Sequence, residues 1–243
     1  MTELQLSRNF RISSTRSEST DTSFEGSNPS TALFSVRKEM IPMAKKSGHL
    51  KVKRFVSHQG KNQYLLISGA EAAVIDVSEA VDEICRHISE MGLSLKYVLV
   101  SHAHPSHVAA LPLLKKKSGA AFCLHEYEYQ HLKESRIDIE PDRILQDNDI
   151  LKLGDIEIKI LLTAGHTKGS LCFWVKAADA LFSGSTLLKK GYGRIWGPSS
   201  MSLMLFSLKR LGSIIPAKTT IYTGSGELTR MENEGWIQCL RSA

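Results

Sequence analysis

The 243-residue sequence has no apolar run near the roughly 18 residues that cross a bilayer, and its N-terminus lacks the apolar core of a secretory signal. It has few cysteines, and Cys85, Cys123, Cys172 and Cys239 are far apart, with no Cys-x-x-Cys pair. Such cysteines are typical of reduced, mostly buried thiols. These absences predict a cytoplasmic protein that does not engage a membrane.

Aromatic residues are also scarce, at 7% of the chain. The net charge is +6, from 31 basic and 25 acidic residues, and the basic clusters are short: Lys115–Lys117 and Lys189–Lys190. The first cluster is expected to close a helix, where cations suit the negative end of the helix dipole. Nucleic-acid binding is therefore disfavoured, and salt-sensitive binding to oligonucleotides would be its sign.

The N-terminal part has too few apolar side chains to build a core. Residues 11–31 contain eleven serines or threonines, and Ile12 and Phe24 are the two large apolar residues among them. Burial of so little apolar surface cannot offset the entropy of ordering. We therefore predict a disordered tail over residues 1–48 and a single folded domain over residues 49–243.

Three histidines lie close together in Ser101-His-Ala-His-Pro-Ser-His107, directly after the apolar run Tyr97–Val100. That run predicts a buried strand, and in the extended chain after it His102 and His104 project to the same side. Imidazoles presented in this way at a strand end are ligands for zinc or iron. The alternative is a cluster of solvated or turn-capping histidines. A further histidine, His166, lies between two strand-like runs.

Five segments, in this order along the chain, resemble the signature motifs of the metallo-β-lactamase superfamily, in particular its glyoxalase II-like branch. They are Ser101–His107, Thr163-Ala-Gly-His-Thr-Lys-Gly-Ser170, Leu181-Phe-Ser-Gly-Ser-Thr186, Gly191-Tyr-Gly-Arg194 and Tyr222-Thr-Gly-Ser-Gly226. The resemblance implies an α+β fold, a four-layer αββα sandwich, where periodicity alone indicates a mixed α/β domain.

The expected elements follow from hydrophobic periodicity and from turn residues. Strands are expected at Lys51–Ser57, Gln63–Ser68, Ala72–Asp76, Leu95–Val100, Ala120–Leu124, Leu151–Leu153, Ile156–Leu162, Leu171–Val175, Ala180–Phe182 and Thr219–Tyr222. Helices are expected at Glu79–Met91, Leu113–Lys117, Glu126–Leu132, Met201–Leu211 and Met231–Leu240.

The resemblance assigns His102, His104 and His166 to the first of the family's two adjacent metal sites. The second site retains His107, whereas its remaining positions carry Ser106, Ser185 and Ser225 in place of the family's Asp, bridging Asp and His. A neutral hydroxyl is a poor ligand for a divalent ion. We therefore expect at most one bound ion, Zn²⁺, with iron as the alternative. Ser106 is expected to cap a short helical turn, as Asp would.

Two functions remain open. A three-imidazole zinc site can lower the pKa of a bound water to about 7, which allows a mononuclear hydrolase of a small ester, thioester or lactone, with His107 as the candidate general base. The alternative is an inactive pseudoenzyme that binds a ligand or a protein. The loss of three second-site ligands is compatible with both.

The segment after Ser185 is expected to form a wall of the site, with Lys190, Tyr192 and Arg194 contacting a small anionic substrate and Trp196 offering a further aromatic face. Glyoxalase II-like enzymes carry a glutathione-binding extension that this sequence lacks after Ala243, so glutathione thioesters are not the expected substrate. Related persulfide dioxygenases hold iron with an Asp at the position of Ser185, which disfavours that reaction as well. Neither the substrate nor the oligomeric state follows from the sequence.

Overall fold

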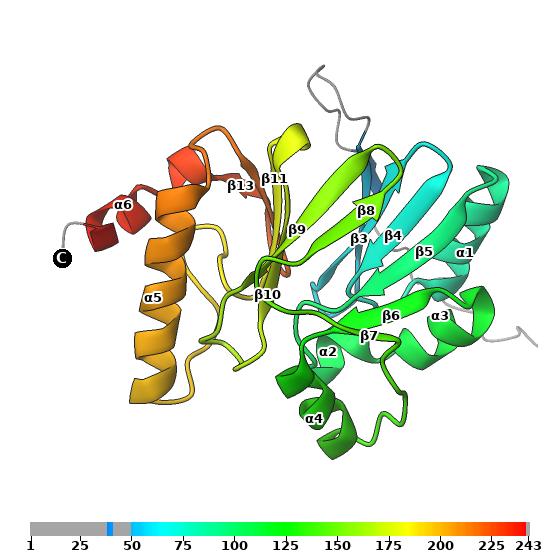
Figure 1. Cartoon of the computed structure of the whole chain (residues 1–243), viewed down its shortest axis with the longest axis horizontal. Coiled ribbons are helices and arrows are strands. Elements are labelled where there is room, and N and C mark those ends of the chain that lie inside the picture. Colours follow the sequence, from blue (N-terminus) through cyan, green and yellow to red (C-terminus); the bar gives the residue numbers. More distant parts are fainter. Residues whose placement is uncertain (1–37, 41–49, 242–243) are drawn as a thin grey trace, which may run out of the picture. The chain divides into compact units, whose positions relative to one another are not determined.

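Two β-sheets form the centre of the fold in the computed structural model, which describes residues 38–40 and 50–241 (Figure 1). The first sheet has strand order β1-β2-β3-β4-β5-β6-β7, and the second has order β13-β12-β11-β10-β9-β8. The strands of the first sheet are β1 (Lys38–Met40), β2 (Lys51–Val56), β3 (Asn62–Ser68), β4 (Glu71–Ile75), β5 (Ser94–Leu99), β6 (Ala121–Leu124) and β7 (Arg143–Ile144). The strands of the second are β8 (Ile150–Leu153), β9 (Ile156–Leu162), β10 (Leu171–Val175), β11 (Ala180–Gly184), β12 (Thr220–Thr223) and β13 (Thr229–Arg230).

Neighbouring strands β1 to β4 are antiparallel, whereas β4 to β7 run parallel. In the second sheet β11 and β12 are parallel and the other pairs antiparallel. Parallel neighbours need long crossovers, which helices supply. Four helices connect strands of the first sheet: α1 (Val81–Glu90), α2 (Pro105–Val108), α3 (Leu111–Ser118) and α4 (Glu126–Glu134).

Three apolar clusters define the layers. One lies between the sheets and includes Tyr64, Ile75 and Phe173. Another joins the outer face of the first sheet to α1, α3 and α4. The third joins the second sheet to α5 (Pro198–Ile214) and α6 (Gly235–Arg241). Helices thus cover the outer faces of both sheets, which confirms the predicted four-layer αββα sandwich (Figure 1).

Most predicted elements are present, with ends that shift by a few residues. The basic run Lys115–Lys117 closes α3, as expected, and Gly119 follows in the left-handed conformation. The predicted helix Met231–Leu240 is instead split into a 3-10 turn, Met231–Asn233, and α6. The break lies at Glu234, whose buried carboxylate accepts hydrogen bonds from Thr229 Oγ1, the Trp236 indole and the Lys190 amide.

The predicted tail lies outside the described residues except for Lys38–Met40, which form β1 and pair with β2. The disorder predicted for residues 1–48 stays a prediction. The four cysteines are free, but Cys123 and Cys172 are the buried ones, while Cys239 is exposed. None of the helices in the described ranges is both long and apolar enough to cross a membrane.

Candidate metal centre

Asp76 organises the histidine motif from the end of β4. It is buried and adopts a left-handed backbone conformation with φ of 54°. Its carboxylate accepts hydrogen bonds from the Ser101 amide (2.8 Å), from Ser101 Oγ (2.7 Å) and from Nδ1 of His107 (3.0 Å). Parallel strands β4 and β5 end at the same edge of the sheet, so Asp76 meets the residues that follow β5 there.

Hydrogen bonds at Nδ1 orient the imidazoles of His102, His107 and His166. Ser101 Oγ, which donates to Asp76, accepts from His102 Nδ1 at 3.0 Å, and the Arg194 carbonyl accepts from His166 Nδ1 at 2.9 Å. With Nδ1 carrying the proton, Nε2 retains the lone pair that a metal ion requires. The Nε2 atoms of His102 and His107 are buried and have no hydrogen-bond partner among the described residues.

The ligand atoms of His102, His104 and His166 all lie within 4.8 Å of one another. His166 Nε2 is 3.0 Å from His104 Nδ1. Tetrahedral zinc–nitrogen bonds of about 2.0–2.1 Å place neighbouring ligand atoms about 3.4 Å apart, so this arrangement suits a divalent ion. His102 Nε2, which is buried and has no hydrogen-bond partner among the described residues, is available as a ligand atom in that geometry.

The surroundings keep these imidazoles in the neutral form that binds metals. Burial lowers the pKa of His102 well below its usual range and lowers the pKa of His104 to about 4. Burial also lowers the pKa of His166, against the opposing effect of its hydrogen bond to Arg194. Metal ions bind neutral imidazole, so protons compete weakly for these three positions.

The buried carboxylate of Glu128, on α4, joins the two histidine loops. It accepts hydrogen bonds from the Ala103 amide (2.7 Å), between His102 and His104, and from the Gly169 amide (2.9 Å), in the loop of His166. A Cβ at Gly169 would lie 2.8 Å from Glu128 Oε1, so glycine permits this close approach. Glu128 therefore fixes the distance between loops that belong to different sheets.

A cavity of about 730 Å³ lies beside the three histidines. It is lined by the predicted second-site residues, which are His107, Ser106, Ser185 and Ser225. Ser106 does not cap a helix, because α2 begins one residue earlier, with Pro105 at its first position and His104 in the capping position. Proline's fixed φ favours the first helical position, which explains the shift.

Only part of the segment predicted to form a wall of the site lines this cavity. Arg194 and Trp196 line it, and the Arg194 guanidinium lies 4.3 Å from the centre of the Trp196 ring. Lys190 and Tyr192 are not among its lining residues. Tyr192 lies against Trp236, with ring centres 6.0 Å apart, because the tight turn from Leu188 to Gly191 directs this part of the segment toward α6.

A second cavity, of about 490 Å³, lies on the other side of His104, His166 and Trp196, which line both spaces. Its remaining walls come from α4, from the start of α5 and from the loop around His166, through residues such as Tyr127, Leu203 and Thr167. The histidine centre is thus open to two spaces of different lining.

The sequence model of the family described as the metallo-beta-lactamase superfamily matches residues 58–225, a range that contains every residue of the centre. The chain belongs to the metallo-β-lactamase superfamily. Its relatives place it with the superfamily's glyoxalase II-like members, as the sequence motifs predicted.

Among these relatives, a hydroxyacylglutathione hydrolase of Pelagibacter ubique is 33% identical over 168 residues, which cover 68% of this chain and 66% of the relative. The probable metallo-hydrolase YqgX of Bacillus subtilis is 29% identical over 188 residues, 71% of this chain and 88% of the relative. The match thus spans about two thirds of the first relative's length.

Two superfamily crystal structures show the same fold at 24% identity. They are the BLEG-1 B3 metallo-beta-lactamase, with a TM-score of 0.67 over 77% of this chain and 96% of that one, and ETHE1 from Myxococcus xanthus, with a TM-score of 0.65 over 76% and 81%. These similarities confirm the predicted fold.

Three residues of the centre were not singled out from the sequence: Asp76, Glu128 and Lys61. Asp76 and Glu128 act through partners 25 or more positions away, so no local motif marks them. Asp76 ends a predicted strand, which was a usable signal. Lys61 lines the main cavity and lies opposite Ser225 in an isolated β-bridge.

Proposed function

We propose that this member of the superfamily is a mononuclear metal-dependent hydrolase of a small ester, thioester or lactone. The observation that carries the proposal is the convergence of the His102, His104 and His166 ligand atoms within 4.8 Å. The membership of the chain in a family of metallo-hydrolases supports the same reaction class. Zinc suits three imidazoles, and iron is the second candidate.

The three imidazoles would hold one divalent ion through His102 Nε2, His104 Nδ1 and His166 Nε2. When bound, such an ion supplies a Lewis acid that polarises a carbonyl group and acidifies water. Ser101 and the Arg194 carbonyl hold the rings of His102 and His166 in the orientation that this ligation needs.

His107 is the proposed general base. The Asp76 carboxylate holds the proton on Nδ1, which leaves Nε2 with its lone pair at the edge of the main cavity. From there Nε2 can accept a proton from the attacking water and return it to the leaving group. Asp76 positions the ring, as the orienting carboxylate of a catalytic triad does.

The substrate is proposed to be a small anionic molecule. Of the residues predicted to contact it, Arg194 is retained, with Trp196 beside it, because both line the main cavity. The name of the Pelagibacter relative, hydroxyacylglutathione hydrolase, supports an acylated small molecule as the substrate class.

Elemental analysis combined with hydrolysis assays tests this function. The purified protein is expected to hold about one metal ion per chain and to hydrolyse members of an ester and thioester panel. His104→Ala is expected to lose both properties, whereas His87→Ala, on α1 and outside both cavities, retains them. A wild-type protein without bound metal would contradict the proposal. So would a His104→Ala variant that holds as much metal as the wild type.

A pseudoenzyme is the second candidate, and the three serines at second-site positions favour it. It predicts a protein, metal-free or metal-bearing, that turns over no member of the panel but is thermally stabilised by a metabolite. Hydrolysis that survives repurification and disappears in His104→Ala would exclude it.

A further inference from the structure

The part of the main cavity that corresponds to the second metal site has an unusual composition. It combines three serine hydroxyls, from Ser106, Ser185 and Ser225, with the side chain of Lys61. Hydroxyl and ammonium groups donate hydrogen bonds and carry no negative charge. A cation would find no carboxylate among these four residues, whereas an oxyanion would find several donors.

The backbone brings Lys61 to this position. Lys61 and Ser225 form an isolated antiparallel bridge, and the Asn62 amide donates to the Gly224 carbonyl at 2.9 Å. Side chains of residues paired in this way are direct neighbours. The Asn62 side chain strengthens the link through hydrogen bonds to the carbonyls of Thr223 (2.8 Å) and Gly226 (3.0 Å).

The positive charge of Lys61 is not neutralised within the described part of the chain, where its ammonium makes no ion pair. It lines the same cavity as His102, His104 and His166, so its charge lies beside the metal centre. Glu79, the carboxylate that lines the cavity, is paired with the His58 imidazole and amide. Arg194 adds a second cation to the lining.

An orphaned hydroxyl gives an independent sign of a missing ligand. Ser78 lines the same cavity, is only 9% exposed, and its Oγ has no hydrogen-bond partner among the described residues. Its backbone amide is already satisfied by Gln63 Oε1, so the hydroxyl is not needed to hold the loop. A buried hydroxyl without a partner costs free energy unless a ligand supplies one.

We propose that the residues Lys61, Ser78, Ser106, Ser185 and Ser225 form an oxyanion-binding subsite that receives a carboxylate or phosphate group of the substrate next to the three-histidine centre. This inference rests on the proposed hydrolase function and narrows its substrate to acyl compounds with an oxyanion close to the bond that is cleaved. The subsite takes the place of a second metal ion, with the Lys61 ammonium as the positive charge.

Calorimetric titration with inorganic phosphate, and separately with acetate, tests the subsite at constant ionic strength. One anion is expected to bind per chain. If phosphate binds more tightly than acetate, the subsite prefers a phosphate group, and if acetate binds more tightly, it prefers a carboxylate. Lys61→Gln is expected to weaken binding by about tenfold or more, the loss typical of a hydrogen bond to a charged group, without a change in metal content. Lys190→Gln, an exposed lysine outside the cavity, is the matched control and is expected to bind as the wild type does.

Two further variants separate this inference from the function on which it rests. His104→Ala is expected to lose the metal and retain anion binding within about threefold. Ser78→Ala is expected to weaken anion binding while its thermal midpoint stays equal or rises, since the variant removes an unpartnered buried hydroxyl. Unchanged affinity in Lys61→Gln, loss of binding in His104→Ala, or no binding of either anion would overturn the subsite. A wild type without metal would instead contradict the hydrolase.

Discussion

Gly193 occupies a position where no side chain fits. A Cβ there would lie 2.3 Å from the Ser185 carbonyl oxygen and 3.0 Å from His166 Nδ1. The close approach lets the Gly193 amide donate to Ser185 at 2.7 Å and keeps the neighbouring Arg194 carbonyl in reach of His166. At Gly191, two residues earlier in the same motif, an added Cβ would have no neighbouring atom within 4 Å.

Gly193→Ala is therefore expected to displace the His166 ring, to lower metal affinity and to reduce the free energy of unfolding by about 1–3 kcal/mol, as overpacking does. Gly191→Ala should stay within about 0.5 kcal/mol of the wild type. Urea denaturation and metal competition with a chromophoric chelator measure both effects. If the two variants have equal metal affinity and equal free energy of unfolding, the close approach at Gly193 does not support His166.

Glu128→Gln tests the two hydrogen bonds that Glu128 accepts, because the substitution preserves the shape of the side chain. The amide would turn one acceptor into a donor facing the N–H of Ala103 or Gly169, which leaves a buried N–H unsatisfied at a cost of about 1–3 kcal/mol. Loss of such a supporting contact typically lowers metal affinity by about 10–100-fold.

The exposed Glu126, in the first turn of the same helix, gives the control variant Glu126→Gln. Metal titrations of the two variants compare them directly. If Glu128→Gln holds metal as tightly as Glu126→Gln, the carboxylate does not position the histidine loops.

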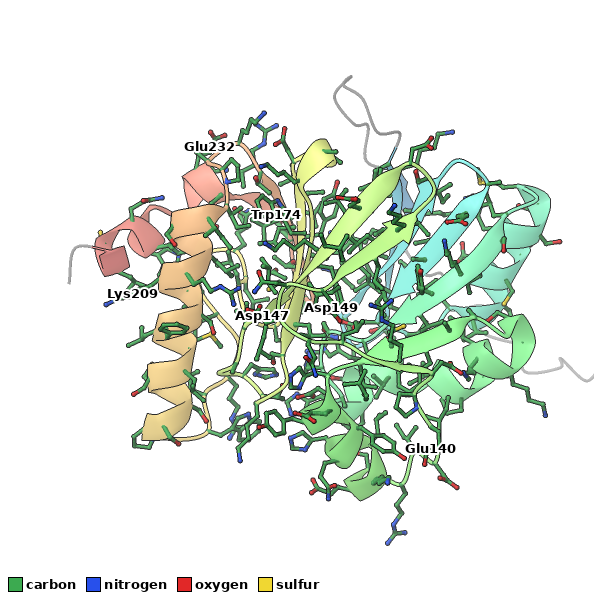
Figure 2. The ribbon with its side chains drawn as sticks, viewed as in Figure 1. Glu140, Asp147, Asp149, Trp174, Lys209 and Glu232 are labelled. Atoms are coloured by element: carbon green, nitrogen blue, oxygen red, sulfur yellow. The ribbon has the colours of Figure 1, made fainter. Side chains whose placement is uncertain are left out.

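At the scale of elements, α5 and the segment before β8 support the loop that carries His166. Asp147 is labelled in Figure 2. Its carboxylate accepts hydrogen bonds from the Leu162 amide and from Arg210, both at 2.8 Å, and Arg210 also donates to the Leu162 carbonyl. Ser207 donates to the Ala164 carbonyl at 2.7 Å. Helix α5 thus holds both the end of β9 and the start of the loop.

Asp147→Ala is expected to free this end of β9. The predicted loss is about 1 kcal/mol in the free energy of unfolding, because Asp147 and Arg210 remain partly exposed to solvent. Hydrogen exchange at the Leu162 amide should accelerate. Asp149→Ala, which loses one hydrogen bond to Gln146 and a loose 3.8 Å pair with Arg143, is the comparison and should leave Leu162 protected.

Elements with their own periodicity could be predicted from the sequence, whereas those set by distant partners could not. Strand β9 begins with alternating buried and more exposed residues and was predicted with its observed ends. The two-residue strands β7 and β13 are too short to carry a period. The metal-ligand candidates were predicted because they share local motifs, but Lys61, Asp76 and Glu128 meet the site only through tertiary contacts.

At the scale of the whole molecule, the centre joins the two sheets. His102 and His104 follow β5 of the first sheet, and His166 follows β9 of the second, so a bound ion would cross-link them. An ion that binds only the folded chain, at about 100 times its dissociation constant, stabilises it by about 2.7 kcal/mol. For a domain of this size the melting temperature should rise by about 5–10 °C.

Scanning calorimetry before and after chelation, with zinc added back, measures this shift. The rise should be absent in His104→Ala. A wild-type melting temperature that does not respond to metal would mean that the histidines do not link the sheets through an ion.

The serine positions provide the last prediction, because restoring the family's ligands should reverse the charge of the cavity. Ser106→Asp, Ser185→Asp and Ser225→His together place two carboxylates and an imidazole around His107 Nε2, which already lacks a partner. Elemental analysis should then find about two ions per chain instead of one. Phosphate affinity, measured in the chelated protein, should fall by more than about tenfold, since two carboxylates would face the anion. A triple variant that gains no second ion, yet folds with the wild-type melting temperature, would show that these residues do not converge on His107.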